Sequence, residues 1–260
     1  MADDDFPLRE MIPPWGSLPI EQFLIKNWNH SSTDAASQQR QKLIQNFLEL
    51  DEIAEADFSL DENPPRVPTP EEIDTILLPW RSDDDLRRKA YYMSKDNVVV
   101  FLRTYYNPGD DGKMNEWVHE TDLFEDNPCW VCLNNPYLFD LGSDWQRVYE
   151  IMPEAAGPVA YTQRPAGSSG LRFKKTLHRT KQNSPHKWRE DRVTEVSGGP
   201  LQNITIATYI VIADQEAFQT GRLRLLCLDD QRNIVREVRV DRNRHQITDF
   251  ILHWDPFLQP

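Results

Sequence analysis

Apolar side chains in the first ninety residues recur at the three- and four-residue spacing of helices that bury one face. One helix is predicted over residues 20–28, directly after Pro19, a residue that suits the first turn of a helix. A longer helix is predicted after the polar residues 31–34, which can cap its start. Its apolar stripe consists of Leu43, Ile44, Phe47 and Leu48. The N-terminal part of the chain is therefore expected to be helical.

Proline and capping signals divide the rest of this region. Residues 57–70 are rich in proline and are typical of a linker. Thr69-Pro70-Glu71-Glu72 has the pattern of a capping box with proline at the first helical position, which predicts a short helix over residues 70–78. Acidic residues 83–85 and basic residues 87–89 predict another helix, because the helix dipole favours acidic side chains at its start and basic side chains at its end.

Further along the chain, short β-branched runs replace the helical spacing. Residues 98–102 form a continuous apolar run, which is typical of a strand buried on both faces. A turn cluster at residues 107–112 precedes a helix that includes Met114 and Trp117. Ser143 is predicted to cap another helix. The apolar face of that helix consists of Trp145, Val148, Tyr149 and Met152.

The last third of the chain predicts three strands. Residues 204–213 form an apolar strand, and residues 222–228 and 234–240 form a hairpin closed by a polar turn. Because side chains alternate along a strand, Leu223, Leu225 and Cys227 are predicted to share one face. Arg222 and Arg224 are then predicted to point to solvent.

Strands and helices interleave without a strict strand–helix–strand repeat. This order predicts an α+β fold, with a mixed or antiparallel sheet, flanking helices and an α-helical N-terminal extension; α/β is the alternative. We expect two domains: an acidic helical region with proline-rich linkers at residues 1–94, and an α+β domain at residues 95–260.

Two segments of the second domain carry a resemblance. The first is Val-Val-Phe-Leu-Arg-Thr-Tyr-Tyr at residues 99–106, followed by the acidic turn at 110–111 and by Trp117. The second begins with Ile-Val-Ile-Ala-Asp at residues 210–214. They resemble the opening and closing parts of an uncharacterised domain family found in bacterial and fungal proteins, over about residues 97–254. That family implies no established activity, so no functional residue is carried over.

Composition narrows the class of protein. The 260 residues include 42 acidic and 29 basic side chains, a formal net charge of −13, and their aromatic content of 10% is too high for a disordered acidic chain. The longest apolar stretch, residues 204–213, is too short to span a bilayer, and the acidic start lacks the pattern of a signal peptide. Three cysteines cannot all pair within one chain, which favours a reducing compartment. We therefore expect a soluble cytoplasmic protein.

The charge is unevenly distributed. Residues 1–171 carry a net charge of −17, whereas residues 172–192 carry +6. The basic side chains that can bind a polyanion or an acidic partner are Arg172, Lys174, Lys175, Arg179, Lys181, Lys187 and Arg189. This stretch can contact nucleic acid, associate with the acidic segments of this chain or of a second copy, or remain solvated. The strong negative charge elsewhere argues against nucleic acid as the partner.

The cysteine and acidic motifs have structural interpretations. Cys129-Trp130-Val131-Cys132 is a C-x-x-C pair, the pattern of a redox dithiol or of half a zinc site. It lies within an apolar run typical of a strand, and no second closely spaced pair of ligands accompanies it. The acidic clusters at residues 83–85 and 110–111 lack the spaced ligands of an EF-hand and favour a helix cap and a turn. No metal and no cofactor are predicted.

Two residues mark a possible ligand pocket. Asp214 follows an apolar strand, where α/β proteins often place functional groups, and Arg103 follows the first apolar run. An aspartate at a strand end is also an ordinary cap or turn former, and no catalytic partner stands at a recognisable spacing. The preferred hypothesis is a non-enzymatic protein-interaction module with an unknown protein partner. The alternative is a small-molecule enzyme with a site at the strand ends near Asp214 and Arg103.

Overall fold

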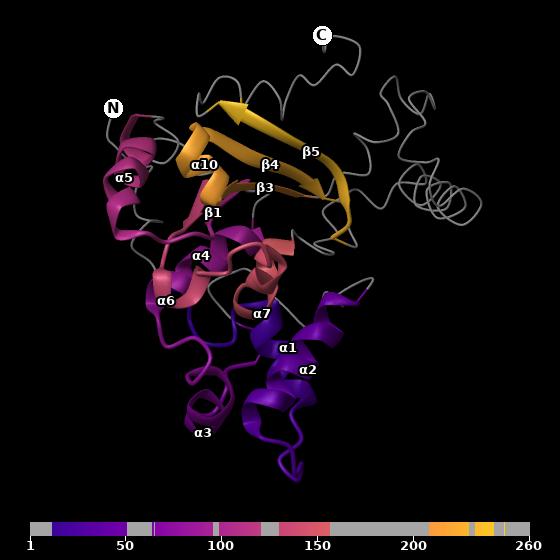
Figure 1. Cartoon of the computed structure of the whole chain (residues 1–260). Coiled ribbons are helices and arrows are strands. Elements are labelled where there is room, and N and C mark those ends of the chain that lie inside the picture. Colours follow the sequence, from indigo (N-terminus) through magenta and orange to yellow (C-terminus); the bar gives the residue numbers. More distant parts are fainter. Residues whose placement is uncertain are drawn as a thin grey trace, which may run out of the picture. The chain divides into compact units, whose positions relative to one another are not determined.

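The structure is a computed structural model of the whole chain, and its described residues contain helices together with one mixed sheet (Figure 1). The described residues are 12–50, 64, 66–95, 99–120, 130–156, 208–228, 232–241 and 247. The predicted α+β fold is confirmed. None of the helices in these ranges is long and apolar enough to cross a membrane.

Contacts within the chain define two compact units. The first includes residues 1–97 and 148–161, and the second includes residues 98–147 and 162–260. The segment 148–161 thus groups with the N-terminal region, a long-range grouping that the predicted boundary near residue 95 did not anticipate.

The described part of the first unit is helical. Its elements are α1 (Pro19–Asn27), α2 (Ala36–Leu48), α3 (Pro70–Glu72), the π-helical turn η3 (Ile73–Leu77), α4 (Asp84–Lys95), α7 (Val148–Ile151) and the 3-10 turn η6 (Pro153–Ala156). The predicted helices are present, with local differences. Ala35, and not a polar residue of 31–34, precedes α2, and it makes no side-chain cap. Thr69 and Glu72 form the predicted capping box, but the following turn is π-helical.

Buried arginines join the helices of this unit. Arg81 donates to Glu154 Oε1 over 2.8 Å, to the other oxygen of that carboxylate, and to the Ile151 carbonyl over 3.0 Å. Arg87 pairs with Glu21 over 3.1 Å, and both side chains are buried. Burying one charge without its partner costs several kcal/mol, so these pairs oblige distant segments to pack together.

A tight turn at Gly16 prepares the start of α1. Gly16 has a φ of +90°, its N–H donates to Glu21 over 2.7 Å, and its carbonyl accepts from Gln22 over 2.6 Å. A Cβ at this position would lie 2.8 Å from the Arg66 carbonyl oxygen and 2.9 Å from Cδ of Pro68. Both the positive φ and the close approach therefore require glycine.

The second unit is built on a mixed sheet. Within the described residues its strands are β1 (Val99–Arg103), β2 (Trp130–Leu133), β3 (Thr208–Ala213), β4 (Arg222–Leu228) and β5 (Ile234–Asp241), in the order β2-β1-β3-β4-β5. The pairs β1–β2 and β1–β3 are parallel, whereas β3–β4 and β4–β5 are antiparallel. The predicted strands and hairpin are thus present, and the sheet is mixed. Residues 204–207 of the predicted strand lie outside the described residues.

In the described part of the unit, two helices pack against one face of this sheet. The remaining elements of the unit are the 3-10 turn η4 (Pro108–Asp110), α5 (Asp111–Glu120), α6 (Pro136–Phe139), the 3-10 turn η5 (Trp145–Arg147) and α10 (Gln215–Thr220). Trp117 of α5 stacks on Phe218 of α10, with ring centroids 4.6 Å apart. Both rings join a core with Phe101, Val211 and other strand residues. Figure 1 shows α10 beside β3 and β4.

Two predicted helices differ in extent or continuity. The helix that contains Met114 begins at Asp111, so it includes the end of the predicted turn. The helix predicted after Ser143 is broken into η5, α7 and η6. Pro153 lies within that segment and explains the second break, because proline has no N–H to donate to a preceding turn.

The Gly16 turn gives a stability prediction. We expect Gly16→Ala to lower the free energy of unfolding by about 2 kcal/mol or more, because alanine is strained at this φ and its Cβ meets the Arg66 carbonyl oxygen and the Pro68 ring. Gly109→Ala is the matched control, since its Cβ would meet only Asn107 Oδ1 at 3.8 Å. Denaturant unfolding with hydrogen exchange of α1 measures both variants. Equal stability of the two would contradict this account of the turn.

Candidate functional site

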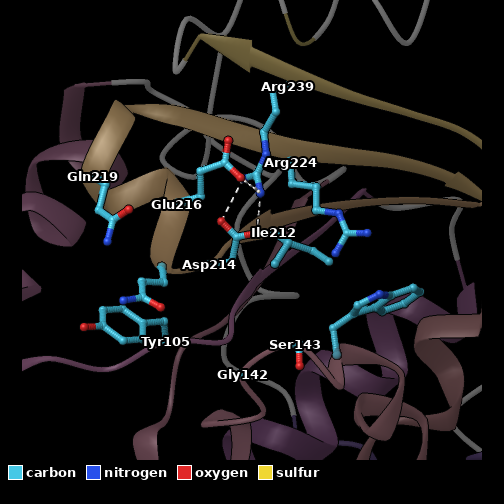
Figure 2. A pocket seen from close by; sticks show the side chains of 11 residues that line it. Tyr105, Gly142, Ser143, Ile212, Asp214, Glu216, Gln219, Arg224 and Arg239 are labelled. Atoms are coloured by element: carbon cyan, nitrogen blue, oxygen red, sulfur yellow. Dashed lines mark hydrogen bonds and ion pairs between the residues drawn. The ribbon is translucent and has the colours of Figure 1, made fainter.

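The candidate site lies where the parallel part of the sheet meets the antiparallel part. β1 and β3 run side by side to the same edge, with Arg103 opposite Ala213. β4 begins at that edge, with Arg224 opposite Ile212. The chain leaves β3 at Asp214 and enters α10, so this edge combines two strand ends, a helix start and a strand start (Figure 2).

A pocket of about 580 Å³ occupies this edge within the second unit. It is lined by Tyr105, Gly142, Ser143, Trp145, Ile212, Asp214, Gln215, Glu216, Gln219, Arg224 and Arg239. Asp214, a predicted site residue, is among them, whereas Arg103 is not. The pocket combines apolar, neutral polar and charged side chains.

Asp214 is held on both oxygens. Its Oδ1 accepts the Ala217 N–H over 3.0 Å, which caps α10, and it accepts Nη1 of Arg239 over 2.7 Å. Its Oδ2 accepts Nη2 of the same guanidinium over 2.6 Å. Partial burial raises the pKa of Asp214, but these hydrogen bonds and the Arg239 charge outweigh it, so the pKa lies below its ordinary value. The carboxyl is therefore ionised at neutral pH.

Arg239 is the most heavily paired cation of the pocket. Besides Asp214, it contacts Glu216 Oε2 over 3.0 Å, and its Nη1 also donates to the Arg222 carbonyl over 3.4 Å. The hydrogen bonds that Arg239 donates to Asp214 raise the pKa of Arg239, which keeps its positive charge in place. This network ties α10 to β5 across the edge of the sheet, as Figure 2 shows.

Arg224 has a different environment from the one predicted. Leu223 and Leu225 lie in the core, so Arg224 belongs to the opposite face of β4. That face is not open solvent here, because Arg224 lines the pocket and its side chain is 22% exposed. It donates from Nε and Nη2 to Glu237 over 2.8 and 3.0 Å. The expectation that Arg224 points to solvent is therefore wrong, whereas Arg222 is exposed.

Apolar and neutral polar groups complete the pocket. Ile212 and Trp145 are buried and give it an apolar floor. Gln215 and Gln219 are exposed on α10, and Ser143 is exposed on the loop after Gly142. Amide and hydroxyl groups of this kind can donate and accept hydrogen bonds without a change of protonation.

Arg103 occupies a buried position on the other face of the sheet. Its side chain is 3% exposed and lies over the rings of Tyr106 and Phe218, at 4.4 and 5.1 Å. Its Nη2 lies 2.8 Å from Asp111, and its Nε donates to the Tyr105 carbonyl over 3.0 Å. Arg103 therefore holds the backbone of a pocket residue and does not itself face the pocket.

The other residues with predicted chemical roles are the cysteines, the candidate metal ligands and the basic stretch, and only some of them lie within the described residues. Cys132 and Cys227 are not joined in disulfides, and burial raises the pKa of Cys227 to about 12. In the described ranges, no group of three or more histidine, cysteine or acidic side chains could hold a metal ion. Cys129 and the basic stretch at 172–192 lie outside those ranges. Their roles stay predictions.

Comparison of this chain with family models, with curated proteins and with solved structures finds no match. The resemblance to an uncharacterised domain family therefore stays a prediction.

Variants of Asp214 separate its two contacts. Because asparagine also caps helices, Asp214→Asn removes the ion pair and keeps the cap, and we expect it to cost about 1 kcal/mol. Asp214→Ala removes both contacts and should cost about 2 kcal/mol. Denaturant unfolding measures both, and Glu216→Gln is the control, because Glu216 is an exposed partner of the same guanidinium.

The difference between wild type and Asp214→Asn should depend on pH. The folded pKa of Asp214 lies below its ordinary value, so the folded protein binds fewer protons than the unfolded chain between the two pKa values. The stabilisation is complete above the unfolded pKa of about 3.9 and is lost as the pH falls through the folded pKa. A difference that grows on acidification would contradict the ion pair.

Proposed function

We propose that this protein is a non-enzymatic protein-interaction module, and that the pocket at the end of β3 receives a polar segment of its protein partner. The main observation behind this proposal is that Asp214 has a structural role. Both oxygens of its carboxylate are engaged by Ala217 and Arg239, and its pKa lies below the ordinary value. A general base works best with a pKa near the working pH, whereas this carboxylate is suited to holding α10 in place.

The other pocket groups support binding. Gln215, Gln219 and Ser143 offer amide and hydroxyl groups that match the hydrogen-bonding groups of a peptide segment. Ile212 and Trp145, which form the apolar floor, are already held in place by burial. Binding at that surface therefore loses little side-chain conformational entropy.

The second candidate is a small-molecule enzyme with its site at these strand ends. One observation favours it: the pocket lies at the carboxyl ends of the parallel strands β1 and β3, where open α/β sheets bind ligands. This candidate needs a group that transfers a proton or attacks a substrate, and Asp214 is poorly suited to either role for the reasons above.

The cytoplasm is the proposed location. Cysteines outside disulfides, such as Cys132 and Cys227, suit a reducing compartment. Association between the acidic segments and residues 172–192, within one chain or between two copies, remains a second proposed interaction. Nucleic acid is not proposed as the partner, because of the net charge of −13.

Site-specific photocrosslinking in living cells tests the proposed interaction. A photoreactive phenylalanine analogue replaces Gln219, which is exposed at the pocket, and in a control protein it replaces Glu116, which is exposed on α5. We expect a discrete protein adduct from position 219 and none of the same mass from position 116. The interaction model predicts that Arg239→Ala weakens this adduct, because the guanidinium orders α10 through Asp214 and Glu216.

Two outcomes would contradict the proposal. One is the same adducts from both positions, since recognition would then not involve the pocket. The other is a stoichiometric small metabolite that copurifies with wild type and is lost on Asp214→Asn, which would favour the enzyme candidate.

A further inference from the structure

The two arginines that line the pocket differ in how firmly they are paired. Arg239 contacts both oxygens of Asp214, one oxygen of Glu216 and the Arg222 carbonyl. Within the described part of the chain, Arg224 is paired with the carboxylate of Glu237. Glu237 does not line the pocket, and its side chain is 44% exposed. Arg224 is thus the cation that can change its partner at the lower cost, because exposed ion pairs contribute about 0–1 kcal/mol.

The guanidinium of Arg224 retains binding capacity. Glu237 occupies the side formed by Nε and Nη2. A guanidinium has five N–H donors and can also bind a second carboxylate through the end formed by Nη1 and Nη2. Figure 2 shows Arg224 pointing away from the Asp214–Arg239 pair. A ligand can therefore reach it without disturbing the contacts that hold α10.

The geometry of the Arg224 guanidinium favours a carboxylate as the ligand. Arg224 and Arg239 are directly opposite each other on β4 and β5, and Asp214, Glu216 and Glu237 already pair with them, so the two arginines carry no unbalanced positive charge. The planar end formed by Nη1 and Nη2 of Arg224 matches the two oxygens of a carboxylate. Recognition therefore depends on this pairing geometry and on displacement of the exposed Glu237.

We propose that Arg224 binds a carboxylate of the partner segment, supplied by an acidic side chain or by a chain terminus. The inference rests on the proposed function, because it names the group that the pocket recognises. The apolar floor and the amides of Gln215 and Gln219 would contact the atoms next to that carboxylate.

Titration with succinate, a small dicarboxylate, tests this proposal on the full-length chain. The Nε–Hε signal of Arg224 is followed by nuclear magnetic resonance, with succinamide as the neutral matched probe. We expect a saturable shift with succinate and none with succinamide. Arg224→Ala should abolish binding, as seen in the shifts of neighbouring backbone amides. Arg222→Ala on the same strand should retain it, because Arg222 does not line the pocket.

Glu237→Gln is a sharper test. If Arg224 had a purely structural role, this variant would not bind succinate more tightly. This variant removes a negative charge that competes for the same guanidinium, so succinate should bind about fivefold more tightly. Unchanged or weaker binding would overturn the inference. Succinate binding that persists in Arg224→Ala, or tighter binding of inorganic phosphate than of succinate, would also overturn it.

The photocrosslinking experiment distinguishes a failure of this inference from a failure of the proposed function. An adduct at position 219 that survives Arg224→Ala unchanged would overturn carboxylate recognition and leave the interaction module intact. Loss of the adduct in Arg224→Ala, with retention in Arg222→Ala, is the expected result. Absence of any adduct in the wild-type background, with normal succinate binding, would instead count against the interaction module.

Discussion

The second unit depends on the position of β3, which pairs in parallel with β1 and antiparallel with β4. Val211 and Ile212 are almost fully buried, so β3 cannot shift without exposing apolar surface. An antiparallel neighbour requires the chain to reverse soon after β3 ends. α10 makes that reversal, beginning at the Asp214 cap and ending at Gly221, whose φ is +77°. The pocket follows from this reversal, because it places the ends of β1 and β3 beside the start of β4.

The charged groups of the pocket first serve that reversal. Asp214 caps α10 and binds Arg239, so the short helix is fixed to β5 by a side-chain network as well as by its core contact at Phe218. A carboxylate used in this way is poorly suited to proton transfer. Arg224 is paired with a half-exposed carboxylate and is the group proposed to bind a carboxylate of the partner. Location at a strand end therefore does not make a charged residue catalytic; its contacts decide its role.

Local sequence features predicted much of the fold. The apolar runs that became β1 and β3, the hairpin of β4 and β5, and the capping box at Thr69 were all predicted, because each depends on neighbouring residues. α10 was not, since six residues are too short for a periodic apolar pattern. The pairing of Arg81 with Glu154 was not predictable either, because their side chains meet only after segments 73 residues apart pack together.

The candidate site was predicted in part. Asp214 was identified by its place after an apolar strand, and it does line the pocket. Arg103 was identified by the same reasoning, but alternation along β1 places it on the face covered by Phe218. Arg224 was missed because alternation alone gives its face of the strand, and not what covers that face. The loop at Ser143 forms part of that cover, and its approach is a tertiary contact.

Hydrogen exchange of the intact protein, alone and saturated with the partner captured at position 219, tests whether the pocket is the binding surface. Binding at the pocket slows exchange in residues 214–220 and 142–145, which belong to it. Exchange in α1 and α2 of the first unit is expected to stay unchanged. Protection confined to those helices, with no change at the pocket, would contradict binding at the pocket.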